Sequence, residues 1–216
     1  MIMKKIFLVA ATMLLTVGAA MAQDYTRLQA SFVANKMTNI ADDAIAPKGA
    51  ALGAVIGFSV SDNLPIYVEP GINLSWSHSA KDLKAGGIKT AEEKFTYMNV
   101  AVPVNGVYKF ELNDKVAFSA HAGLNFKVNF MAKEHYKVVG GDKSDCSWIS
   151  KDDMGDRENR ANIFQLGGQV GCGVHLQQFY IGWQYQSDFM KFQESDYSGA
   201  EKHKWHTNYI TIGYTL

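Results

Sequence analysis

The chain has 216 residues, with 21 basic and 21 acidic side chains, 47% apolar and 12% aromatic residues, and only 4 prolines. A zero formal charge argues against a nucleic-acid surface, and so much apolar and aromatic mass argues against disorder. The length allows one ordinary domain, and two cysteines are too few for a disulfide scaffold.

Residues 1–22 have the pattern of a secretory signal peptide. Lys4 and Lys5 form a positive start, and an apolar stretch runs from residue 6 to residue 17. A small-x-small motif then ends at Ala22, so cleavage is predicted before Gln23. The apolar stretch is shorter than the roughly 20 residues of a membrane-spanning helix. The expected mature chain is therefore one domain, residues 23–216.

Beyond this segment the hydropathy alternates with a period of two. In residues 116–130 one parity is wholly apolar, from Val116 to Phe130, and the other is small or polar. The same split occurs in residues 66–77 and 164–176. Alternation of this kind predicts β-strands. Extended along the chain, it predicts eight of them: 26–35, 48–61, 65–78, 94–111, 115–131, 162–176, 178–191 and 205–216.

The predicted connections alternate between short turns and long segments, the longest being Ala132 to Ala161. An even number of strands with short turns at one end and long loops at the other is typical of outer-membrane barrels. The fold class expected is all-β: an eight-stranded antiparallel up-and-down transmembrane β-barrel in the outer membrane.

A soluble lipocalin-like binder of apolar ligands would also have eight strands, but with its apolar parity inside. Here the other parity is mostly Gly, Ser, Asn and Gln, which suits a narrow polar interior. Aromatic residues also gather near the strand ends on the apolar parity, as expected at two membrane interfaces. Those at the short-turn end are Phe58, Tyr108, Phe110, Phe118, Phe179 and Tyr214, and those at the loop end are Trp76, Phe126, Phe130, Phe164 and Phe189.

Three segments carry a family resemblance: DNLPIYVEPGINLS (62–75), YMNVAVPVNGVYKF (97–110) and NYITIGYTL (208–216). They resemble the small outer-membrane β-barrel domains of Gram-negative bacteria, porin-family and PorT-like, which are akin in architecture to OmpX and the OmpA barrel. The resemblance covers the mature chain and implies the fold and the outer membrane. It also implies outer-membrane lipid and the barrel assembly machinery as partners, and it transfers no activity and no site residues.

An eight-stranded barrel has room inside only for side chains, so its inward polar residues are expected to fill it. The predicted polar cluster of the lumen is Arg27, Glu69, Lys109, His121 and Lys127, with Gln165, Gln169, His175 and Gln184 beside it. Glu69 needs a cationic partner there, and the sequence does not say which of Arg27, Lys109 and Lys127 it is. A proton or ion path through these residues is the alternative interpretation.

The segment from Ala132 to Ala161 is expected to be a long loop without a strand of its own. Long loops are usually functional, so Tyr136, Trp148 and Ile149 are predicted to contact an unknown surface partner. The charges in this loop nearly cancel and lack EF-hand spacing, and the two histidines 203 and 206 have no accompanying ligands. No metal and no cofactor are predicted.

The expected function is that of a non-enzymatic barrel whose surface loops serve adhesion, docking or envelope stabilisation. The alternative is an enzyme that modifies outer-leaflet lipid, with His78 and Ser79 at the outer rim. Adjacent residues of a strand point to opposite faces, which disfavours a shared proton. Cys146 and Cys172 are expected to be two free thiols, since one lies in the long loop and the other on the lipid-facing parity.

Overall fold

The computed structural model describes residues 24–37, 46–61, 63–150, 161–192 and 204–216. The predicted signal peptide, its cleavage site, residue 203 and the acidic part of the long loop at 151–160 lie outside these ranges. The described residues contain no helix that is both long and apolar enough to cross a membrane.

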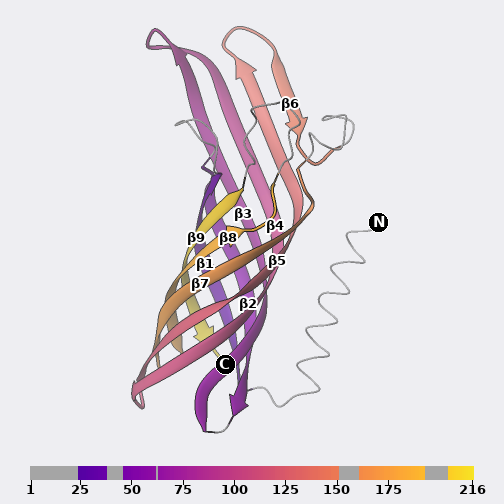
Figure 1. Ribbon diagram of the computed structural model, residues 1–216. Coiled ribbons are helices and arrows are strands. Elements are labelled where there is room, and N and C mark those ends of the chain that lie inside the picture. Colours follow the sequence, from indigo (N-terminus) through magenta and orange to yellow (C-terminus); the bar gives the residue numbers. More distant parts are fainter. Residues whose placement is uncertain (1–23, 38–45, 62, 151–160, 193–203) are drawn as a thin grey trace.

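The described chain is built from antiparallel strands (Figure 1). They are β1 (Tyr25–Met37), β2 (Lys48–Ser61), β3 (Leu64–Ala85), β4 (Ile88–Asn113), β5 (Val116–Val138), β6 (Lys143–Ser147), β7 (Phe164–Leu176), β8 (Phe179–Asp188) and β9 (Trp205–Thr215). Each strand of the ring β1-β2-β3-β4-β5-β7-β8-β9 pairs with its neighbours, and β9 pairs back onto β1. The predicted eight-stranded, up-and-down barrel is therefore confirmed.

The ninth strand, β6, stands outside this ring. It pairs only with the outer part of β5, from Lys133↔Ser147 to Lys137↔Lys143, whereas the inner part of β5 pairs with β7 from Val128 onward. The prediction that residues 132–161 hold no strand is wrong. The reason is that outward positions in this hairpin are polar or charged, so the apolar alternation disappears although the backbone pairing continues.

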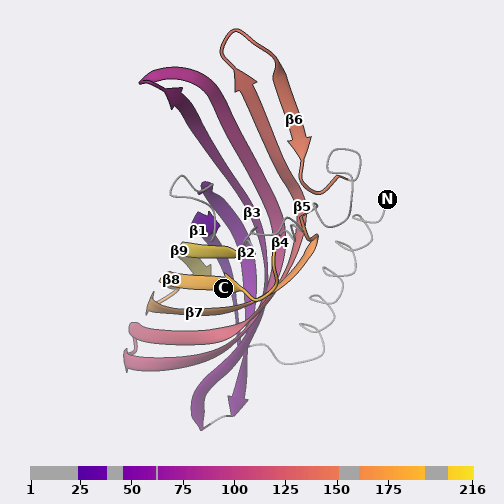
Figure 2. The same cartoon turned by 45° about the horizontal axis from the view of Figure 1, so that its top comes forward.

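Three strands of the barrel run far beyond the others at one end (Figures 1 and 2). β3 and β4 stay paired as far as Ala85↔Ile88, where a two-residue turn of Gly86 and Gly87 closes the hairpin. Both glycines have positive φ, 58° and 84°, which a twisted hairpin turn of this length requires. We call residues 79–95 of β3 and β4 with residues 133–147 of β5 and β6 the extension.

A β-bulge marks the place where β5 leaves the barrel. Met98 pairs with Met131, but the next residue, Asn99, pairs with Asn129, so Phe130 is an extra residue. The bulge resets the alternation, and Ala132 continues the inward row of Asn129.

The barrel wall is apolar on its outside and polar on its inside, the reverse of a soluble protein. Large apolar side chains cover the outside, where Leu52 is 67% and Ile212 is 62% exposed, while charged Glu69 and Lys127 inside are each 2% exposed. This distribution rules out the soluble lipocalin-like alternative, because a solvated exterior would be polar. The predicted aromatic residues at the short-turn end are exposed on the outside, except Phe58, which is 8% exposed.

Glycines on the inward parity make room for large interior side chains. A Cβ atom on Gly173 would lie 2.3 Å from the Tyr180 ring, and one on Gly182 would lie 2.1 Å from the Tyr180 hydroxyl. The small inward residues thus allow the barrel to close around Tyr180 and the charged side chains beside it.

Candidate functional site

The interior near the short-turn end holds a buried ion pair. Arg27 of β1 donates from Nη2 to Oε2 of Glu69 on β3 at 2.9 Å, and the Tyr25 hydroxyl also donates to this carboxylate. The guanidinium carbon lies 4.1 Å from the centroid of the Tyr180 ring. Arg27 is therefore the partner of Glu69 that the sequence left open.

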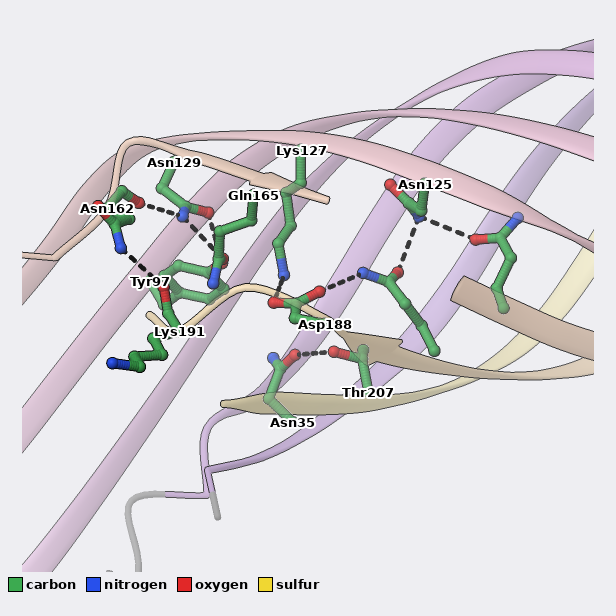
Figure 3. A network of polar contacts seen from close by, with 12 residues as sticks. Asn35, Tyr97, Asn125, Lys127, Asn129, Asn162, Gln165, Asp188, Lys191 and Thr207 are labelled. Atoms are coloured by element: carbon green, nitrogen blue, oxygen red, sulfur yellow. Dashed lines mark hydrogen bonds and ion pairs between the residues drawn. The ribbon is translucent and has the colours of Figure 1, made fainter. Parts of the chain in front are cut away.

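The other two predicted cations lie elsewhere in the lumen. Lys109 lies with Nζ 5.6 Å from the centroid of the Tyr25 ring. Lys127 forms its own ion pair, with Nζ 2.6 Å from Oδ2 of Asp188 on β8 (Figure 3). Both partners of this second pair are buried, at 2% exposure each.

Side-chain amides fill the space between the two ion pairs. Asn125 donates to Oε1 of both Gln169 and Gln186, at 2.8 Å each. Gln169 in turn donates to Asn105 at 2.6 Å, and Gln186 donates to Oδ1 of Asp188 at 3.1 Å. These bonds join β4, β5, β7 and β8 across the interior.

The same kind of contact continues on either side of the amides. His121 lies 3.3 Å from Oε1 of Gln184, and His175 lies 3.1 Å from the Ser119 hydroxyl. Toward the loop end, Asn129 donates to Gln165 at 2.9 Å and accepts from the Tyr97 hydroxyl (Figure 3). The structure thus places all the predicted lumen residues inside the barrel, where Gln184 also donates to Oε1 of Gln169 at 3.1 Å and so joins His121 to the amides.

The remaining space around the Arg27–Glu69 pair is about 20 Å³. It is lined by Arg27, Glu69, Asn73, His121 and Gln184 among others. A space of this size holds about one water molecule. This favours a filled lumen over a continuous path for ions.

Planar bilayers containing the purified protein are accordingly expected to show no stable, porin-sized conductance. The expectation follows from eight strands closing around a lumen that side chains fill. Single-channel recording checks it, and large reproducible openings from the monomer would contradict the filled-barrel interpretation.

A cluster of rings closes the lumen at the loop end. We call it the aromatic cap; its members are Phe95, Tyr97, Trp148, Phe192 and Trp205. Tyr97 stacks on Trp205 at 5.1 Å between centroids, and Phe192 meets Trp205 edge to face at 5.4 Å. Trp205 is wholly buried, and within the described part of the chain its Nε1 has no hydrogen-bond partner.

The aromatic cap corrects the prediction that Trp148 and Ile149 form an exposed contact surface. Both are half-buried and pack against the cap, with Trp148 5.0 Å from Phe95 between ring centroids. Trp148 Nε1 also donates to Oε2 of Glu134 at 2.8 Å. Of the three predicted contact residues, Tyr136 alone is exposed, at 36%.

The residues of the proposed enzyme site point apart. His78 lies on the outward face, stacked on Trp76, and its Nδ1 is 3.1 Å from the Thr96 hydroxyl. Ser79 lies on the inward face, opposite Phe95. The structure thus agrees with the expectation that His78 and Ser79 point to opposite faces, and the hydroxyl that lies beside His78 is that of Thr96.

The cysteines and potential metal ligands carry little further chemistry. Neither Cys146 nor Cys172 is in a disulfide, as predicted. Within the described ranges, no group of three or more His, Cys, Asp and Glu side chains could hold a metal ion.

Two groups of interior residues escaped the sequence interpretation. Asp188 continues the inward parity of Gln184 and Gln186, so counting one more step along β8 finds it. The aromatic cap is harder to find, because Phe95, Tyr97 and Trp205 are large aromatic residues on the parity that is mostly small or polar elsewhere. The sequence feature that could have revealed the cap is the presence of aromatic residues at inward positions near the loop ends of β4 and β9.

Comparisons with solved structures return small membrane barrels. Ail, the attachment invasion locus protein of Yersinia pestis, in complex with the heparin analogue sucrose octasulfate, is 14% identical with a TM-score of 0.49, over 91% of this chain and 100% of that chain. Neisserial surface protein A is 12% identical with a TM-score of 0.46, over 88% and 96% of the chains. The outer membrane enzyme PagL is 8% identical with a TM-score of 0.48, over 86% and 98%.

No protein-family model matches the chain, and no curated protein matches it. The PorT-like part of the resemblance therefore stays a prediction. The closed ring of eight strands, the apolar exterior and the filled polar interior are features of the chain itself. By these features the protein is a small eight-stranded β-barrel of the outer membrane.

Proposed function

We propose that this protein is a non-enzymatic surface barrel that docks a partner outside the cell through the extension. The observation that carries the proposal is the strand pairing of the extension. It runs from Ser79↔Phe95 to Ala85↔Ile88, with one register shift between Leu83 and Lys84, and includes β6. The paired strands project beyond the barrel (Figure 2), and their pairing restricts the shapes that this surface can adopt. Little entropy is then lost when it binds a partner.

Elimination supports the same assignment. The outside of the barrel faces lipid, and the inside is filled by ion pairs, amides and the aromatic cap. The extension is the part of the described chain that stands beyond both. Binding residues are commonly presented in this way, at the ends of a rigid scaffold.

The inward face of the extension has a mixed surface suited to a contact. Leu83 and Val138 lie on either side of Ala91, and Tyr136 lies opposite Glu93. Partial burial, together with the nearby carboxylate of Glu134, raises the pKa of Glu93, which Lys81 partly offsets. This face thus combines apolar contacts with two neighbouring carboxylates.

The proposal is tested by trimming the extension. One Asn-Gly turn replaces residues 82–92, and a second replaces residues 137–143, so that Lys81↔Glu93 and Tyr136↔Ser144 become the last pairs. Trp148 and Glu134 stay in place, which keeps the aromatic cap. Heat-dependent gel mobility is expected to remain, because the barrel ring is untouched.

Cells that carry equal surface amounts of the unaltered or the trimmed protein are then compared. The measurement is their attachment to immobilised matrix proteins, to sulfated polysaccharide and to one another. Attachment is expected to fall to the level of cells without the protein. The control changes Asn113 and Asp114 to alanine at the opposite, short-turn end, and is expected to attach normally. Attachment that survives trimming but disappears on changing Glu69 or Lys127 would place the activity in the interior instead.

The lipid-modifying enzyme is the second candidate, favoured by the contact between His78 and the Thr96 hydroxyl at the outer rim. No described carboxylate hydrogen-bonds to His78, and such a group normally orients the base. Mass spectrometry of lipid A from cells with and without the protein tests this candidate. A mass change that disappears in Thr96→Val would support the enzyme and overturn the non-enzymatic proposal.

A further inference from the structure

The outward side chains switch from apolar to cationic at the loop end of the barrel. On β1 the outward residues Phe32 and Ala34 are followed by Lys36 toward the loop end. On β2 the outward residues change from Leu52 to Lys48 in the same direction. Exposure confirms the direction, because Phe32 and Leu52 are 50% and 67% exposed on the lipid-facing side.

The next three strands also leave the apolar row at this end, β4 and β5 for a lysine and β3 for a histidine. On β3, Trp76 is followed by His78. On β4 the outward row changes from Met98 to Thr96 and Lys94, and on β5 Lys133 follows Met131. We call Lys36, Lys48, Lys94 and Lys133 the lysine collar.

The opposite end of the barrel shows no such change on these strands. On β3 and β4 the outward side chains stay apolar up to the strand ends, where Leu64 is 53%, Leu112 is 56% and Phe110 is 52% exposed. The collar is therefore a property of the loop end and not of strand ends in general.

The nearest outward carboxylates lie farther out on the extension and already form ion pairs. Glu92 is 2.7 Å from Lys94, and Asp82 pairs with Lys89. Among the described residues, no carboxylate lies within ion-pair distance of Lys36, Lys48 or Lys133. Three of the four collar lysines are thus exposed cations directly above a lipid-covered surface.

We propose that the lysine collar binds the phosphate-bearing head groups of the surrounding outer-leaflet lipid. A charged side chain is unfavourable in hydrocarbon, so the switch from Trp76 and Met98 to the collar marks the depth at which lipid head groups begin. Anionic head groups at this depth complement the exposed ammonium groups of the collar. The stacked pair of Trp76 and His78 lies at the same boundary, where amphipathic rings are favoured.

The proposal is tested with the full mature protein in vesicles of phosphatidylcholine containing phosphatidylglycerol. Spin-labelled forms of the two lipids report which one the protein retains at its surface. The unaltered protein is expected to prefer phosphatidylglycerol about fivefold, the factor that one cation near an anionic lipid surface provides. A collar variant with Lys36, Lys48 and Lys133 changed to glutamine is expected to lose most of this preference.

The matched control changes three exposed lysines farther out on the extension, Lys84, Lys137 and Lys143, to glutamine. It has the same net charge as the collar variant and is expected to keep the preference. Equal preferences in the two variants, whether both high or both low, would overturn the proposal. Loss of the preference in inorganic phosphate but not in chloride of equal ionic strength would indicate a site for free anions and overturn the lipid assignment.

Discussion

Replacement of Asp188 by alanine is expected to lower the free energy of unfolding of the barrel by about 3–5 kcal/mol. Lys127 Nζ lies 2.6 Å from Oδ2 of Asp188, and both residues are 2% exposed. Without the carboxylate, an ammonium group stays buried without its counter-charge, and Gln186 loses its acceptor. The measurement is a urea titration in lipid vesicles, with the folded fraction read from heat-dependent gel mobility.

The matched control replaces both partners, Lys127→Met with Asp188→Leu. Removing a buried pair together is often nearly neutral, so the double variant is expected to unfold close to the unaltered protein. Glu69→Ala is expected to act in the same direction as Asp188→Ala, because Arg27 would lose its carboxylate. An unchanged midpoint in Asp188→Ala would mean that water reaches Lys127 and that the lumen is not filled at this level.

Replacement of Trp205 by alanine is expected to cost about 3–5 kcal/mol, since it removes a large, wholly buried ring. Tyr97, Phe95 and Phe192 all contact this ring, so a cavity would open in the middle of the aromatic cap. The same urea titration measures the loss.

Trp205→Phe is the control for ring size. It keeps an aromatic ring and removes an indole N–H that has no partner in the described structure, so a much smaller loss is expected. A Trp205→Ala variant as stable as the unaltered protein would mean that the aromatic cap does not contribute to barrel stability. It would also show that the packing of Trp148 and Ile149 against the cap does not contribute to the free energy of unfolding.

The sequence by itself determined the barrel, its lipid-facing side and the contents of its lumen. Alternation with a period of two reports which face of each strand is apolar, and it persists wherever one face meets lipid and the other a narrow interior. It therefore located β1, β7 and β9 within a few residues and assigned Arg27, Glu69 and Lys127 to the inside.

Pairing and the loop end were decided only by the tertiary structure. Whether Arg27, Lys109 or Lys127 meets Glu69 depends on strand register and barrel closure, which alternation does not report. Beyond Met98 and Met131 the outward face no longer meets the hydrocarbon of the membrane, so the apolar alternation stops although backbone hydrogen bonds continue as far as Gly86 and Gly87. That is why a segment interpreted as an exposed loop contains β6. It is also why Trp148 packs inward on the rings of Phe95 on β4 and Phe192 beyond the end of β8, which only the closed barrel brings together.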